Sequence, residues 1–64
     1  MRKLTFNQKA VLEIDNTDED TETFTGGSTI EAIVVDEDAE TISFMWEHLL
    51  FNDVPKLFFL DFED

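Results

Sequence analysis

The chain has 64 residues, near the lower limit at which a single hydrophobic core folds without disulfides or metals. It contains no cysteine, which excludes disulfides and thiolate metal sites, while 42% apolar residues, seven of them Phe, argue against disorder. Sixteen acidic residues oppose four basic ones, and the net charge of −12 disfavours direct binding of nucleic acid or anionic membranes. We therefore expect one acidic domain over residues 1–64.

The N-terminal segment shows the alternation of a half-buried strand, bent near Asn7-Gln8. The residues of one parity are apolar, namely Leu4, Phe6, Ala10, Leu12 and Ile14. The next stretch, DNTDEDTE from Asp15 to Glu22, has five carboxylates in eight positions and no large apolar residue, so it is predicted to be an exposed loop.

The middle of the chain predicts two further strands. Gly26-Gly27 suits a tight turn, and Thr29–Val35 is rich in β-branched residues on both faces, which indicates a central strand. The acidic stretch Asp36–Glu40 predicts a hairpin turn. It leads into a strand over Thr41–Glu47, in which Ile42, Phe44 and Trp46 face one way.

The C-terminal third is harder to assign. The stretch after Trp46 is compatible with a longer strand or a short helical turn, and Val54-Pro55-Lys56 with a one-turn helix or a short strand. Phe58, Leu60 and Phe62 are predicted to share one face of a last strand. The whole pattern predicts an all-β or mainly β fold with one short helical turn, a small meandering barrel of four to five antiparallel strands.

Four segments carry a resemblance to a known class: KLTFNQKAVLEI, TFTGGSTIEAIVVDED, ETISFMW and VPKLFFLDFED. Together they resemble short bacterial and phage proteins with SH3-like barrels. Gly27, the acidic hairpin Asp36–Asp38 and Val54-Pro55 lie where that pattern has them. The segment EHLLFND departs from it, because the pattern has a Gly-containing hairpin there. The resemblance implies a fold and no activity.

The acidic residues suggest a nucleic-acid mimic, in which carboxylates take the places of phosphates. Twelve net charges correspond to roughly 20 Å of duplex DNA, which carries one charge per about 1.7 Å. The expected contact residues are nine acids in two stretches: Asp15, Asp18, Glu19, Asp20 and Glu22, then Asp36, Glu37, Asp38 and Glu40. Their role would be to pair with Lys and Arg that normally hold phosphates.

Two other uses of these acids stay open. They could simply solvate two turns, where Asp and Asn are favoured. Alternatively, Asp18, Asp20 and Glu22 have the alternate spacing of calcium ligands, but the Gly and the final Glu of a calcium-binding loop are missing. We therefore expect no metal and no cofactor.

Catalysis has little support in the sequence. His48 is the only histidine, and Ser28 and Ser43 have no identifiable base, so no enzyme is expected. His48, beside Trp46 and Leu49, is expected to be a packing residue. The aromatic residues Phe44, Trp46, Phe58 and Phe62 are expected in the core.

Other apolar residues are expected to be hard to bury, namely Phe51, Phe59, Met45 and Leu49. An apolar patch flanked by acids would be the anchor of a protein interface or a homodimer seam.

The favoured hypothesis is a phage-type inhibitor, acting in the host bacterial cytoplasm. It would occupy the DNA-binding channel of a bacterial defence complex and block DNA binding, and it resembles the anti-CRISPR and anti-restriction inhibitors in acidity and size. Its partner would be a basic nucleic-acid-binding protein or complex. The alternatives are a structural adaptor that docks or dimerises through its apolar C-terminal segment, and a protein that neutralises a cationic toxin.

Overall fold

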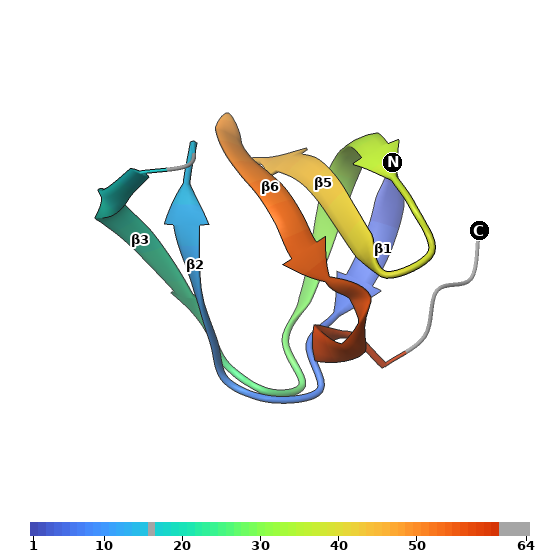
Figure 1. The fold of residues 1–64 in the computed structure, drawn as a ribbon. Helices are drawn as coiled ribbons and strands as arrows, with labels where there is room; N and C mark the ends of the chain where they lie inside the picture. The colour runs from blue at the N-terminus through green and yellow to red at the C-terminus, as the bar shows by residue number, and fades with distance from the viewer. Residues whose placement is uncertain (16, 61–64) are drawn as a thin grey trace.

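The computed structural model describes residues 1–15 and 17–60, without the side chains of Thr17 and Asp18. The described strands are β1 (Arg2–Thr5), β2 (Ala10–Ile14), β3 (Thr17–Phe24), β4 (Thr29–Glu37), β5 (Thr41–Trp46) and β6 (Leu49–Pro55), followed by a 3-10 turn, η1 (Lys56–Phe58). All pairings are antiparallel, in a four-stranded sheet ordered β1-β4-β5-β6 and a two-stranded sheet of β2 and β3 (Figure 1). The predicted all-β class with one short helical turn is confirmed.

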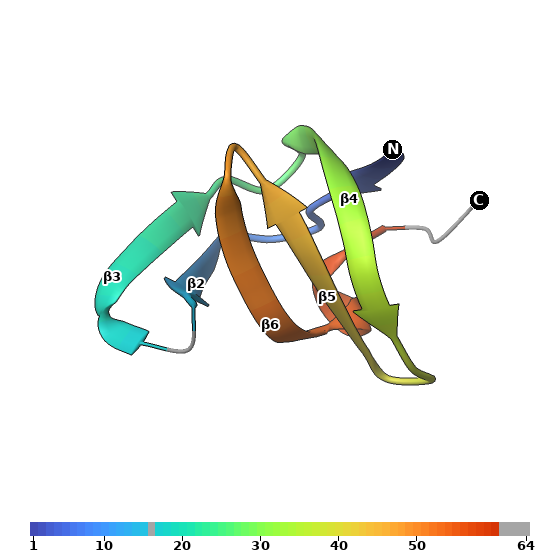
Figure 2. The ribbon, with the colours of Figure 1, turned by 90° about the horizontal axis from the view of Figure 1, so that it is seen from above.

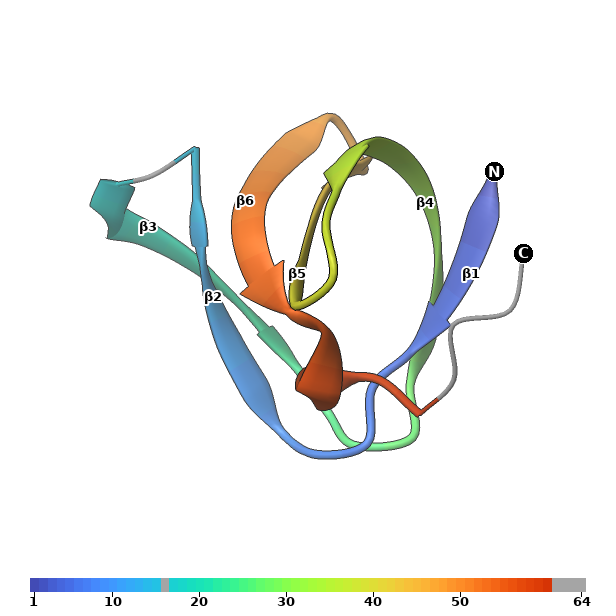
Figure 3. The same cartoon turned by 45° about the vertical axis from the view of Figure 1, so that its right-hand side comes forward.

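The predicted barrel of four to five strands is wrong in strand number and in closure. Six strands are described, and the two sheets stand side by side without joining into a barrel (Figure 3). The amide of Asp15 donates to the carbonyl of Leu50 in β6 at 2.8 Å, and Phe6 forms an isolated bridge with Phe59.

The bend predicted near Asn7-Gln8 separates β1 from β2. Its position is fixed by Asn7, whose amide donates to the carbonyl of Phe58 at 2.9 Å and whose side chain donates to the carbonyl of Leu57 at 2.7 Å. The alternation was predicted correctly, because Leu4, Phe6, Ala10 and Leu12 are buried and Ile14 packs against them.

The acidic stretch predicted as a loop is a strand instead. β3 pairs with β2 through the register Ala10↔Phe24, Val11↔Thr23 and Leu12↔Glu22. Phe24 anchors its far end, stacked on Phe6 with ring centroids 4.4 Å apart. Acidic side chains at exposed positions of a strand keep their hydration, so charge alone does not prevent the backbone from pairing.

The central position predicted for Thr29–Val35 is confirmed, since β4 lies between β1 and β5. Only one of its faces is covered: Ile30 and Ala32 are buried, whereas Ile33 and Val35 are 53% and 52% exposed. The small two-stranded sheet leaves the outer face of β4 open (Figure 2).

The segment EHLLFND forms a hairpin although it has no glycine. Trp46 pairs with Leu49, so Glu47 and His48 are the two loop residues, with φ of 52° and 65°. A two-residue loop with both φ positive is the mirror-image turn that fits the twist of antiparallel strands, and Asn-Gly is its usual sequence. His48, expected to pack, lies exposed in this turn.

Of the two alternatives left open for Val54-Pro55-Lys56, the one-turn helix is found from Lys56 on as η1, while Val54 and Pro55 end β6. The last strand predicted to follow is wrong. After η1 it is Phe59 that is buried, at 4% exposure, while Leu60 is 60% exposed. A 3-10 turn has about three residues per turn, so it breaks the period-two parity on which the prediction relied. Phe62 lies outside the described residues.

The buried side chains of the described residues form one cluster, rich in Phe, between the two sheets. Phe44 packs on Phe51 with ring centroids 5.2 Å apart, and Phe24 meets the edges of Phe51 and Trp46 at 5.7 and 5.2 Å. Phe44 was correctly expected in this core, with Trp46 and Phe58 half-buried against it.

Two residues expected to resist burial are buried, since Phe51 is 0% and Phe59 4% exposed. Leu49 packs against the core, and Met45 is 36% exposed.

Candidate functional site

The β2–β3 hairpin, residues 10–24, carries only negative charge. We call it the acidic hairpin; it contains no Lys or Arg, and its six acids are Glu13, Asp15, Asp18, Glu19, Asp20 and Glu22. Figures 1 and 2 show it at one side of the molecule, beside β6. The fold therefore gathers six carboxylate-bearing positions on one projecting ribbon.

The acids of the hairpin differ in exposure. Asp15, Glu19 and Asp20 are exposed, and Glu22, which pairs with Leu12, is half-buried. Asp15 stands in the turn with a φ of 56°, and its amide bond to Leu50 ties the turn to β6. The side chain of Asp18 lies outside the described residues.

The hairpin also has an open strand edge. β3 pairs with β2 on one side, and no other described strand pairs with its second side. An unpaired edge offers backbone donors and acceptors to another chain, and charged side chains along it oppose such pairing. The acids of β3 therefore have a structural use in addition to any binding role.

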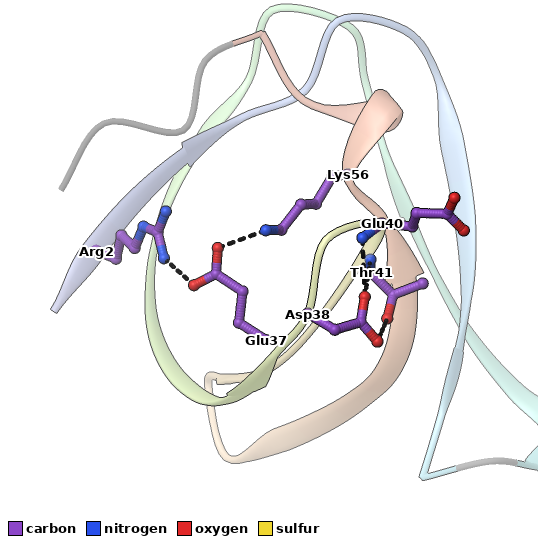
Figure 4. Close-up of polar contacts among 6 residues, drawn as sticks. All are labelled: Arg2, Glu37, Asp38, Glu40, Thr41 and Lys56. Atoms are coloured by element: carbon purple, nitrogen blue, oxygen red, sulfur yellow. Dashed lines mark hydrogen bonds and ion pairs between the residues drawn. The ribbon is translucent and has the colours of Figure 1, made fainter.

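The second acidic stretch, Asp36–Glu40, covers the last two residues of β4 and the turn to β5, and two of its four carboxylates, those of Glu37 and Asp38, are engaged within the fold. Glu37 forms ion pairs with Arg2 at 2.6 Å and with Lys56 at 2.7 Å (Figure 4). Hydrogen bonds from Lys56 and then from Arg2 lower the pKa of Glu37. This carboxylate joins the start of β1, the end of β4 and η1.

Asp38 holds the turn itself. Its Oδ1 accepts hydrogen bonds from the amides of Glu40 and Thr41, both at 2.8 Å, and its Oδ2 accepts one from the Thr41 hydroxyl at 3.1 Å (Figure 4). The Thr41 amide and then the Glu40 amide lower the pKa of Asp38 by stabilising its ionised form. This side-chain pattern is a common way of closing a turn.

The structure thus divides the nine expected contact residues into two groups on opposite sides of the molecule (Figures 1 and 2). Asp15, Glu19, Asp20 and Glu22 belong to the acidic hairpin, together with the backbone of Asp18. Asp36 and Glu37 end β4 and Asp38 and Glu40 lie in the turn that follows, and all four residues are exposed.

Sequence reasoning missed Glu13, which belongs to the acidic hairpin. Its position among the outward residues of the first alternating segment was the available signal. It also missed the two ion pairs of Glu37, because Arg2 and Lys56 are both far from Glu37 in the sequence.

Metal binding and membrane insertion find no geometric support in the described residues. No group of three or more His, Asp or Glu side chains converges there as metal ligands, and the side chain of Asp18, one of the calcium candidates, lies outside them. No described helix is long and apolar enough to cross a bilayer.

Comparison of the chain with models of protein families, with curated proteins and with solved structures finds no match.

Proposed function

We propose that the chain is a non-catalytic binding protein whose acidic hairpin occupies a basic, nucleic-acid-binding surface of another protein. The observation that carries this proposal is the contrast between the two acidic stretches. In the β4–β5 turn, Glu37 is neutralised by Arg2 and Lys56 and Asp38 closes the turn. The acidic hairpin collects six acids and no base on one projecting ribbon.

The spacing of charge along β3 fits this role. An antiparallel strand rises about 3.4 Å per residue, which equals the axial rise per phosphate of one DNA strand. Four of the five positions from 18 to 22 bear carboxylates, so the ribbon carries charge at nearly the density of a single DNA strand. Lys and Arg spaced to hold successive phosphates would meet carboxylates at similar intervals.

The overall charge density is lower than that of duplex DNA along the longest dimension. Twelve net charges over the 31 Å extent give one charge per about 2.6 Å, against about 1.7 Å for the duplex. The local density on β3 therefore supports the proposal better than the average does, and it favours contact through the hairpin.

The most specific form of the proposal is an inhibitor of the anti-CRISPR or anti-restriction type, which blocks DNA binding by a bacterial defence complex. It is supported by small size and acidity, because a compact anionic domain can enter a channel built for nucleic acid. Attraction to such a channel would speed association and weaken with salt.

The test is capture of partners from bacterial lysate on the immobilised protein, with elution by salt raised from about 50 to about 500 mM or by competing duplex DNA. We expect a nucleic-acid-binding protein that both eluents release. A partner that resists salt and has no nucleic-acid function, or no partner at all, would contradict the proposal.

Variants of the hairpin locate the contact. Glu19→Lys, Asp20→Lys and Glu22→Lys combined should abolish capture, and Glu19→Gln, Asp20→Asn and Glu22→Gln combined should weaken it, since attraction falls with each charge removed. Circular dichroism of both variants checks that the fold is retained. Equal capture by all three proteins would exclude the hairpin as the contact.

A further inference from the structure

The outer face of β4 and β5 carries exposed apolar side chains. Ile33 and Val35 are 53% and 52% exposed, and Met45, the cross-strand partner of Ile33, is 36% exposed. Figure 2 shows β4, β5 and β6 side by side, with β2 and β3 at the far side of β6. The three side chains form what we call the apolar strip, which no described segment covers.

A shallow groove of about 240 Å³ adjoins the strip where β5 turns into β6. Its lining includes Ile33 and Met45 from the strip, Trp46, and two glutamates, Glu31 in β4 and Glu47 in the turn. Met1 and His48 complete the lining, while the ring of half-buried Trp46 packs toward the core, against Phe24 at 5.2 Å. The groove therefore combines an apolar lining with two carboxylates.

Both glutamates of the groove are available to a partner. Glu31 and Glu47 are exposed, and neither side chain makes a hydrogen bond or ion pair with the part of the chain that the structure describes. Lys3 is the cross-strand partner of Glu31, yet no ion pair forms between them. This contrasts with Glu37, which binds two cations at once.

We propose that this groove receives an arginine side chain of the partner protein. The aliphatic stem of an arginine would lie on Ile33 and Met45, and its planar guanidinium would meet the Glu31 and Glu47 carboxylates. Arginine combines these features because it has an apolar stem, is always charged and donates in a fork to carboxylates.

The charge of the chain decides between occupants of this surface. A second copy would bring another net charge of −12 to the same face, with Glu31 and Glu47 of each copy close to those of the other. A basic protein has the complementary charge. The inference therefore rests on the proposed function and adds a specific anchor to its hairpin contact.

The groove can be tested without the natural partner. We would titrate N-acetyl-arginine amide, and separately N-acetyl-lysine amide, into the isotope-labelled protein at about 150 mM salt, where long-range attraction is screened. We expect the arginine probe to shift the NMR signals of the Ile33 and Met45 methyl groups and of the Glu31 and Glu47 backbone amides, more than the lysine probe does. Equal shifts from both probes, or shifts confined to β3, would overturn the inference.

A second test uses the partner captured with the hairpin. Glu31→Gln with Glu47→Gln should weaken its binding about tenfold, as expected for loss of an anchored charged contact. Glu40→Gln with Asp53→Asn removes the same charge outside both the groove and the acidic hairpin, and it should weaken binding much less. If both pairs weaken binding equally while salt and duplex DNA still release the partner, the groove is excluded and the proposed function stands. If no nucleic-acid-binding partner is captured, the proposed function fails. The titration with the arginine probe then tests by itself whether the groove binds arginine.

Discussion

Lys56 and Glu37 form an ion pair of 2.7 Å that joins the first residue of η1 to the last residue of β4. The same carboxylate holds Arg2 at 2.6 Å, so one side chain links three segments that are distant in the sequence. Two of the four basic residues of the chain are therefore engaged with a single acid, in a protein with sixteen acids. The acidic hairpin itself contains no Lys or Arg.

We expect Glu37→Gln to lower the stability of the fold, in a way that depends on pH and salt. Hydrogen bonds from Lys56 and Arg2 lower the pKa of Glu37 from its usual value of 4.5. The stabilisation is therefore fully present above about pH 4.5 and is lost as the pH falls through the lowered pKa. Urea unfolding of both proteins at several pH values measures the difference between them.

Asp36→Asn is the matched control, because it removes one charge from the neighbouring exposed position. It should lack this pH-dependent loss, since relief of self-repulsion acts equally in both variants. A Glu37→Gln difference that stays constant from pH 7 to below about pH 3 would show that the ion pairs contribute nothing.

His48→Gly should stabilise the protein by about 1 kcal/mol. His48 has a φ of 65° in the β5–β6 turn, and a residue with a Cβ in the left-handed region costs roughly 1–2 kcal/mol. Glycine removes that cost, partly offset by the extra freedom it gives the unfolded chain. Thermal and urea unfolding would detect the gain.

Gly27→Ala provides the opposite case. Gly27 has a φ of +86°, and an added Cβ would meet nothing within 4 Å, so the expected loss of roughly 1 kcal/mol comes from backbone strain alone.

A His48→Gly protein that is less stable than the parent would contradict the first of these two predictions. It would mean that the imidazole makes contacts that outweigh the strain.

Phe59→Ala should unfold the protein or nearly do so. Phe59 is 4% exposed and packs on Phe6 and Phe44, with ring centroids 4.7 and 6.2 Å away. Truncating a buried Phe costs about 3–5 kcal/mol, which is close to the total stability expected of so small a core. Leu57→Ala, at a position 73% exposed, should change stability by less than about 0.5 kcal/mol.

The same pair of variants bears on docking through the C-terminal segment. Circular dichroism and NMR dispersion should show an unfolded Phe59→Ala protein and a folded Leu57→Ala protein. A folded Phe59→Ala protein that had lost a partner would instead favour the adaptor hypothesis.

Strands were predicted correctly where apolar and polar side chains alternate, because that alternation reflects burial of one face. They were missed where the side chains are all polar, because polarity shows only that the side chains are hydrated. Leu4, Phe6, Ala10 and Leu12 alternate and are buried as expected, because one face of β1 and β2 must cover the core. The acids of β3 indicated a loop, yet only their side chains needed water, and the backbone paired with β2. The amino-acid composition of β3 does not reveal that its backbone pairs with that of β2.

The candidate site was predictable in its residues and not in its geometry. The nine acids are obvious in the sequence, but their division between a projecting hairpin and a turn closed by Asp38 depends on long-range contacts. The ion pairs of Glu37 require β1, β4 and η1 to meet, which no local pattern encodes. In the apolar strip, the exposure of Met45 was anticipated, whereas the apolar residues on both faces of Thr29–Val35 indicated only a central strand, and no described layer covers Ile33 and Val35.

The acids of β3 should also keep the protein monomeric. Because the second side of β3 has no strand partner among the described residues, neutralising its charges would expose an edge able to pair with a second copy. We expect Glu19→Gln with Asp20→Asn to self-associate in sedimentation velocity as the protein concentration rises, while the parent protein stays monomeric.

Glu40→Gln with Asp53→Asn removes the same charge outside the acidic hairpin, so it separates protection of the edge from general repulsion. Equal association of both pairs would assign the effect to net charge alone. If the β3 variant stays monomeric, the edge needs no charge to protect it, and binding to a cationic partner becomes the better physical reason for acids on this strand. If it associates and still captures its partner, the same carboxylates are structural, and the contact must lie elsewhere on the molecule.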